Sequence, residues 1–176
     1  MSRHIIDNAP LVVKAMKLAE KAHRGQKRRG SGLPYFYHPV TVAIIVASFK
    51  QSKHLSEILC AAFLHDTFED TSLTFKQTAR MFTPLVASLV QELTNDEKEI
   101  ARIGKLEYHK KKLVGISSYA LYIKLGDRLH NVSDNPSEKM VPETLELMEH
   151  LKKNRKLTKI QKTMVAEIIS ICKAKK

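Results

Sequence analysis

The chain has 176 residues, and a hydrophobic fraction of 43% is enough for a single domain over residues 1–176 with one core. The two cysteines, Cys60 and Cys172, form no CxxC pattern, which argues against a zinc finger or a disulfide framework and favours a reducing compartment. The first residues lack the layout of a signal peptide, and the longest apolar run, Val42–Phe49, is too short to span a bilayer. We therefore expect a soluble cytoplasmic protein with no membrane partner.

The chain is strongly basic, with a net charge of +12 from 30 Lys and Arg against 18 Asp and Glu. Such a balance predicts an anionic partner, for example a nucleic acid, a membrane surface or a polyphosphate ligand. The charge is concentrated in Arg24–Arg29 and in Lys152–Lys162. The first segment lies in a glycine-punctuated loop that could line a ligand site. For the second, on an amphipathic helix, we favour a solvated face.

Hydrophobic periodicity is helical nearly throughout the chain, and no alternating run predicts a strand. Residues 94–105 are polar and are expected to form a loop or a mobile lid. The sequence therefore predicts an all-α bundle in one domain. In chain order, the expected helices are Leu11–His23, Val40–Phe49, Leu55–Phe68, Thr74–Phe82, Pro84–Leu93, Ser117–Val132, Pro142–Asn154 and Leu157–Ala174.

The segment Leu64–Thr71 reads LHDTFEDT and places one histidine and three carboxylates directly after an apolar run. Buried charges are costly unless they are paired or bound to a metal, so this cluster predicts a divalent cation. If the helix continues through the cluster, His65 and Glu69 share one face, and Asp66 and Asp70 share another. The imidazole and one carboxylate would hold the ion, and the remaining carboxylates would handle a water molecule.

Two ligands make a weak metal site, so further ligands are expected from elsewhere in the chain. The candidates are His38, in PYFYHP, and Asp127, in KLGDRLHN. Alone, His38 could be a capping or core histidine, and Asp127 could pair with Lys124 or Arg128. Together with the adjacent histidine and aspartate of the acidic cluster, they complete a set without thiolate. Such a set suits Mn²⁺, Fe²⁺ or Mg²⁺ better than structural zinc.

The order His, His-Asp, Asp resembles the HD phosphohydrolase superfamily. The segments AHRGQKRRGSGLPYFYHP, AAFLHDTFEDT and YALYIKLGDRLHN are similar to the hydrolase domain of RelA/SpoT-type alarmone enzymes, from Ala15 to about Asn131. The resemblance implies an HD-domain helical bundle that binds one Mn²⁺, with Fe²⁺, Mg²⁺ or another divalent ion as alternatives. The implied metal ligands are His38, His65, Asp66 and Asp127, and the residues implied to position or deprotonate the attacking water are Glu69 and Asp70.

The implied reaction is removal of pyrophosphate from the 3′ position of ppGpp or pppGpp, an anionic guanine nucleotide, to give GDP or GTP. In the family, an arginine of the basic loop contacts the base. The family usually has one residue between this arginine and Ser-Gly, whereas this chain has two, Arg29 and Gly30, so Arg28 and Arg29 remain equal candidates. The residues implied to contact substrate are therefore Arg28, Arg29, Ser31, Tyr35 and Asn131.

Two alternatives remain open at this point. The same site could act on another nucleotide, as a nucleotidase or on the 2′-phosphate of NADPH. The fold could instead serve as a basic nucleic-acid-binding module without turnover, although Glu69 and Asp70 argue against it. Because the chain stops at Lys176, it resembles the stand-alone small alarmone hydrolases, for which hydrolysis without synthesis is expected. The sequence does not indicate an oligomeric state.

The remaining histidines have no partner in the motifs. His130 lies three positions after Asp127, and a surface position or a place behind the metal ligands is favoured over direct coordination. Four further histidines without partners in the sequence are expected to face solvent: His4, His54, His109 and His150. Cys60 is expected to be a small buried residue of a core helix.

Overall fold

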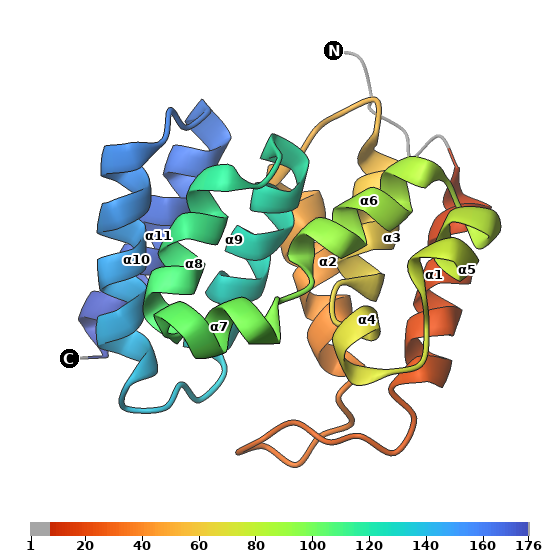
Figure 1. Ribbon diagram of the computed structural model, residues 1–176, viewed down its shortest axis with the longest axis horizontal. Coiled ribbons are helices and arrows are strands. Elements are labelled where there is room, and N and C mark those ends of the chain that lie inside the picture. Colours follow the sequence, from red (N-terminus) through yellow and green to blue (C-terminus); the bar gives the residue numbers. More distant parts are fainter. Residues whose placement is uncertain (1–7, 176) are drawn as a thin grey trace.

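The computed structural model describes residues 8–175, and within this range it contains eleven helices and no strand (Figure 1). An isolated bridge between Lys27 and Pro34 is the one β-type pairing of the described residues. The all-α prediction is therefore confirmed. The helices are α1 (Ala9–Ala22), α2 (Tyr37–Phe49), α3 (Leu55–Leu64), α4 (Thr67–Asp70), α5 (Phe75–Met81), α6 (Pro84–Leu93), α7 (Glu97–Ile103), α8 (Lys105–Gly115), α9 (Ser118–Ser133), α10 (Met140–Asn154) and α11 (Lys159–Ala174).

Short polar side chains fix the starts of the long helices. Thr83 accepts a hydrogen bond from the backbone N–H of Val86, and Pro84 occupies the first turn of α6. Ser117 caps α9 in the same way. Thr158 and Gln161 form a reciprocal capping box at the start of α11. These local signals explain why the expected and observed helix starts agree within a few residues.

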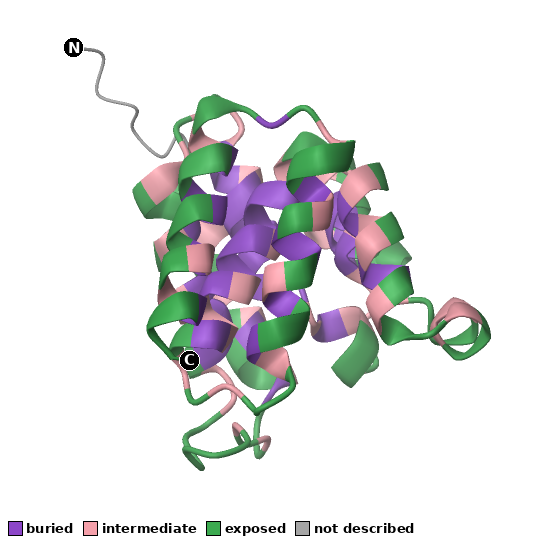
Figure 2. Ribbon diagram, turned by 90° about the vertical axis from the view of Figure 1, so that its left-hand side faces the viewer, coloured by how far each residue is buried: buried purple, intermediate pink, exposed green. Residues whose placement is uncertain are grey.

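The helices enclose two groups of buried apolar side chains, and α9 belongs to both. One group joins α9 to α1, α2, α3 and α6, and the other joins it to α8, α10 and α11, as the positions of these helices in Figure 1 show. The buried residues, purple in Figure 2, lie toward the inside of the bundle. Ile123 lies in the first group, whereas Leu125 lies in the second. A Cβ on Gly126 would lie 3.0 Å from Val46 Cγ2, so this glycine lets α9 approach α2 closely. The helix that carries Asp127 is thus held from two sides.

Residues 94–105 do not form the expected loop or lid. They contain α7, which Asp96 caps by accepting from the backbone N–H groups of Lys98 and Glu99. Arg102 pairs with Glu99 through two contacts of 2.7 Å. No residue of α7 is buried, and its largely charged sequence offers only the half-buried Ile100 and Ile103 as an apolar stripe, too short for periodicity to reveal the helix.

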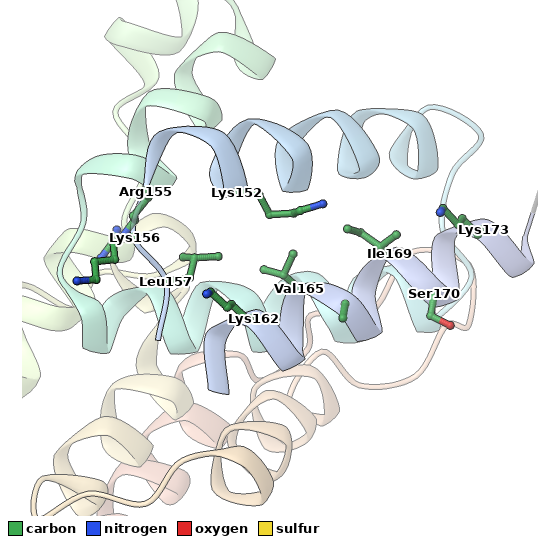
Figure 3. Close-up of a pocket in the computed structure, with 10 residues that line it drawn as sticks. Lys152, Arg155, Lys156, Leu157, Lys162, Val165, Ile169, Ser170 and Lys173 are labelled. Carbon is green, nitrogen blue, oxygen red and sulfur yellow. The ribbon is translucent and has the colours of Figure 1, made fainter. Parts of the chain in front are cut away.

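The basic segment near the C-terminus borders a cavity of about 800 Å³ beside α11 (Figure 3). Lys152, Lys162 and Lys173 surround an apolar floor that includes Val165 and Ile169. None of the candidate site residues lines this cavity. No helix of the described range is long and apolar enough to cross a membrane.

The shared role of α9 predicts unequal effects of two matched substitutions. Ile123 is fully buried and Ile44 is 61% exposed. We expect Ile123→Ala to lower the free energy of unfolding by about 2–5 kcal/mol, because it removes core contacts and leaves a cavity. Ile44→Ala should change it by less than about 0.5 kcal/mol. Denaturant titration followed by circular dichroism measures both values, and equal effects would contradict the assignment of Ile123 to the core.

Candidate metal centre

The sequence predicted one helix over Leu55–Phe68, with the acidic segment as its continuation. In the structure the acidic segment does not continue α3. Helix α3 ends at Leu64 and α4 begins at Thr67, so His65 and Asp66 lie in the break. The Thr67 hydroxyl donates to the backbone carbonyl of Leu64 at 2.7 Å, which satisfies an acceptor at the end of α3. The break directs His65 and Asp66 toward the same point, which adjacent residues of an unbroken helix could not do as closely.

The four predicted metal ligands converge there. His38 comes from the first turn of α2 and Asp127 from the middle of α9. His38 Nε2 lies 3.2 Å from His65 Nε2 and 3.3 Å from Asp127 Oδ1. Asp66 Oδ2 lies 3.0 Å from His65 Nε2 and 3.6 Å from His38 Nε2. His38, His65 and Asp127 are all buried, and their ligand atoms lie within 4.8 Å of one another.

Opposite charges keep both carboxylates ionised in this buried position. Burial raises the pKa of Asp66, but the charge and hydrogen bond of His65 outweigh it and hold this pKa below its usual range. Burial also acts to raise the pKa of Asp127. Lys124, which lies 3.2 Å from Oδ2, and His38 outweigh it and hold this pKa below its usual range. Asp127 therefore makes the salt bridge to Lys124 with one oxygen and faces the histidines with the other.

The pKa values of the two imidazoles, His38 and His65, shift in opposite directions. Burial lowers the pKa of His38. Burial also acts to lower the pKa of His65, but the charge and hydrogen bond of Asp66 overcome it and raise this pKa to about 9. The cluster thus favours a positive charge at its centre, either a proton or a cation.

The donor atoms fit a divalent cation. His65 Nδ1 lies 2.8 Å from the carbonyl oxygen of Ala62, which can only accept, so the N–H of a neutral His65 is on Nδ1. The lone pair of Nε2 is then directed at the cluster, as in metal-binding histidines whose other nitrogen is hydrogen-bonded. Two imidazole nitrogens with two carboxylates and no thiolate suit Mn²⁺, Fe²⁺ or Mg²⁺.

Two residues predicted to contact substrate, Tyr35 and Asn131, are hydrogen-bonded directly to predicted metal ligands. The Tyr35 hydroxyl donates to Asp66 Oδ2 at 2.5 Å, and burial followed by the Asp66 charge raises the pKa of Tyr35 far above its usual value. Asn131 Nδ2 donates to Asp127 Oδ1 at 2.5 Å. Arg28 Nη2 in turn donates to Asn131 Oδ1 at 2.9 Å. These residues therefore also orient the side chains predicted to bind the metal.

A cavity of about 650 Å³ lies between the basic loop and the residues after α9. Gly30 lies where these two segments meet, and its φ of +88° favours glycine. A Cβ at this position would also lie 2.7 Å from the side-chain Nδ2 of Asn135. Ser31 is exposed and does not line the cavity; its hydroxyl accepts from the backbone N–H of Leu33. The predicted substrate residues that do line it are Arg28, Arg29, Tyr35 and Asn131.

Asn131 also lines a second cavity, of about 270 Å³, that contains three cationic side chains: Lys105, Lys124 and Arg128. His109 lines it as well, and the prediction that His109 faces solvent is wrong, because its side chain is buried on the inner face of α8. Burial, followed by the charge of Lys124, lowers the pKa of His109 to about 3. The imidazole is neutral at physiological pH, so the charged side chains of the cavity are these three cations and the carboxylates of Asp127 and Glu143.

The two carboxylates predicted to act on water have different surroundings. Glu69 accepts from the backbone N–H of Asn95 at 2.7 Å and from its side-chain amide at 3.1 Å. The Asp70 carboxylate has no hydrogen-bond or ion-pair partner within residues 8–175. Burial, followed by the Asp66 charge, raises its pKa. Asp70 is therefore the carboxylate better suited to accept a proton, and Glu69 fixes the chain before α7.

Sequence reasoning assigned no role to His23, which directly precedes the basic loop. It is buried; its Nδ1 lies 2.7 Å from Gln26 Oε1, and its Nε2 has no partner among the described residues. Its ring lies 4.9 Å from that of Tyr35. For His130 the sequence favoured either a surface position or a place behind the metal ligands. In the structure it contacts His38, and burial lowers the pKa of His130 to about 4. His4 lies outside the described residues.

Comparison with known proteins gives one family match and several relatives. Residues 15–156 match the family described as HD domain. The chain is 37% identical over 141 residues to the probable GTP diphosphokinase RSH2, chloroplastic, of Oryza sativa subsp. japonica, covering 74% of this chain and 19% of the relative. It is 41% identical over 132 residues to the GTP pyrophosphokinase rsh of Brucella melitensis, covering 71% of this chain and 17% of the relative. The chain thus spans less than a fifth of these relatives.

A solved structure has the same fold over nearly its whole length. It is described as a metazoan ortholog of SpoT that hydrolyzes ppGpp and plays a role in starvation responses. The TM-score is 0.76 at 24% sequence identity, and the match covers 92% of this chain and 95% of that one. At this identity the likeness shows the fold.

Proposed function

This chain belongs to the HD domain family, and we propose that it is a Mn²⁺-dependent hydrolase that removes pyrophosphate from the 3′ position of ppGpp or pppGpp. The observation that carries the proposal is the convergence of His38, His65, Asp66 and Asp127 beside two cavities with basic linings. Nitrogen and oxygen ligands that converge on one point, next to cavities lined by cationic side chains, suit phosphoryl transfer to water.

The four converging side chains would hold one Mn²⁺. When bound, this ion supplies Lewis acidity, which lowers the pKa of the attacking water and offsets charge on phosphoryl oxygens. Tyr35 and Asn131 orient the two carboxylate ligands through the hydrogen bonds described above. Lys124 balances the negative charge of Asp127 through their salt bridge.

Asp70 would act as the general base. The water oxygen bonds to the phosphorus that is attached to the 3′ oxygen. The bond between that phosphorus and the 3′ oxygen breaks, and one water proton passes to Asp70. The 3′ oxygen leaves and takes up one proton from solvent, Asp70 returns its proton to solvent, and the products are pyrophosphate and GDP or GTP. Glu69 contributes by holding Asn95 and the chain before α7 beside the site.

The two cavities suggest how the nucleotide lies. The cavity of about 650 Å³ has the size of small-molecule sites and would take the guanosine, with Arg28 or Arg29 against the base. The cavity of about 270 Å³ would take phosphate groups against Lys124 and Arg128. Asn131 lines both and marks the junction, next to the metal ligand Asp127.

The comparisons support this proposal. The solved structure with the same fold is described as hydrolyzing ppGpp, and this chain covers 95% of it. The relatives are named for guanine nucleotide chemistry, although the chain spans only a small part of each. The proposal includes a cytoplasmic location, in keeping with the sequence expectation.

A first experiment measures release of pyrophosphate and GDP from ppGpp with Mn²⁺ and with a chelator. We expect release only with the metal, and loss of release in Asp66→Asn, because the amide removes a charged ligand. Glu167→Gln on the exposed face of α11 is the control and should keep wild-type activity. A panel of pppGpp, NADPH and deoxynucleotides reports the preferred substrate. Metal-independent release, or full activity of Asp66→Asn, would contradict the proposal.

A second experiment separates the two further carboxylates. We expect Asp70→Asn to lower kcat by about 10²–10⁴-fold with little change in Mn²⁺ affinity, because it removes the proton acceptor and no metal ligand. Glu69→Gln should have a smaller effect, because the amide oxygen can still accept from Asn95. Steady-state kinetics with a Mn²⁺ titration measures both. A larger loss in Glu69→Gln than in Asp70→Asn would show that the base is assigned to the wrong carboxylate.

A further inference from the structure

His130 makes the contact behind the metal ligand His38. It lies on α9, one turn after Asp127, and its Nδ1 is 2.7 Å from His38 Nδ1. The ring centroids are 4.9 Å apart and the ring planes lie within 19° of parallel. Because the nitrogens are much closer than the centroids, the rings meet edge to edge. This is the geometry of an in-plane N–H···N hydrogen bond, in which one histidine donates and the other accepts.

The metal site decides which histidine donates. His38 Nε2 faces His65, Asp127 and Asp66, and it can bind a cation only through its lone pair. The hydrogen of a neutral His38 must then be on Nδ1, so His130 Nδ1 is the acceptor. In the opposite arrangement His130 donates, and the His38 hydrogen moves to Nε2, where it points into the metal site and prevents coordination. The lone pair of His130 therefore favours the tautomer of His38 that can bind metal.

Asp134 supports the same arrangement from the other side of His130. Its Oδ2 lies 4.0 Å from His130 Nε2, where a negative charge favours the hydrogen on Nε2 and the lone pair on Nδ1. The same oxygen accepts from Arg28 Nη2 at 3.1 Å and from Arg28 Nε at 3.3 Å. Arg28 is thereby connected to His38 through Asp134 and His130.

A second route joins Arg28 to the metal ligands. Arg28 donates to Asn131, and Asn131 donates to Asp127. His38 and Asp127 face each other at 3.3 Å, so the two routes close a ring of contacts. The basic loop, the end of α9 and two metal ligands are therefore joined in one ring of contacts, in which the step from Asp134 to His130 is an electrostatic contact of 4.0 Å.

We propose that His130 is a positioning residue of the metal centre, which holds His38 in its metal-binding tautomer and, through Asp134, couples that ligand to the nucleotide-binding loop at Arg28. The inference rests on the metal site of the proposed function. It implies that a residue that touches no metal sets metal affinity, as hydrogen-bond partners of metal ligands commonly do. It also implies that Asp134 influences metal binding from beyond His130.

The test is calorimetric titration of Mn²⁺ into the full chain after removal of bound metal by a chelator. His130→Phe keeps a ring against His38 but offers no acceptor, and we expect Mn²⁺ affinity to fall by about 10–100-fold. His130→Gln offers a carbonyl oxygen to the His38 N–H and should restore much of the loss. Asp134→Asn should weaken binding less than His130→Phe. Wild-type affinity in His130→Phe would overturn the proposal, as would equal losses in His130→Phe and His130→Gln.

Two controls separate positioning from folding and from the proposed reaction. The melting temperatures of the metal-free variants should match the wild type, and His150→Phe on α10, outside the ring of contacts, should bind Mn²⁺ normally. Because the readout is metal affinity, it does not depend on the substrate. A wild-type chain that shows these effects but hydrolyses no ppGpp would overturn the proposed function alone. A wild-type chain that binds no Mn²⁺ would overturn both.

Discussion

The structure depends on two carboxylates, the buried Asp127 and the half-buried Asp66, at the point where α2, the break after α3, and α9 meet. Buried charges must be matched by opposite charges or by a metal. Lys124 and His65 supply opposite charge within the chain, and the remaining donor atoms face inward. The arrangement of the helices around α9 can be understood as the support that holds this electrostatic cluster in place.

Much of the site was predictable because its signals are local. Capping residues and proline fixed the starts of α6, α9 and α11, and the adjacent His65 and Asp66 marked the predicted metal cluster without any knowledge of the fold. The family that the three motifs suggested is the HD domain family to which the chain belongs. The assignment of individual residues to metal, water and substrate remains a prediction.

What the sequence could not provide depends on contacts between distant segments. The break between α3 and α4 is stabilised by a Thr67 hydroxyl and by the partners of Asp66, none of which alters helical periodicity. Helix α7 is short, largely charged and without a buried residue, and His109 is buried although three lysines follow it. In each case tertiary structure decided the outcome.

The central claim, one divalent ion shared by His38, His65, Asp66 and Asp127, is tested most directly by anomalous diffraction from Mn²⁺-soaked crystals. The account predicts a manganese peak within coordination distance of both Nε2 atoms and of an oxygen of each carboxylate, and loss of that peak in Asp127→Asn. A manganese peak elsewhere with none at these four side chains, or a peak at the site that is unchanged in Asp127→Asn, would contradict it.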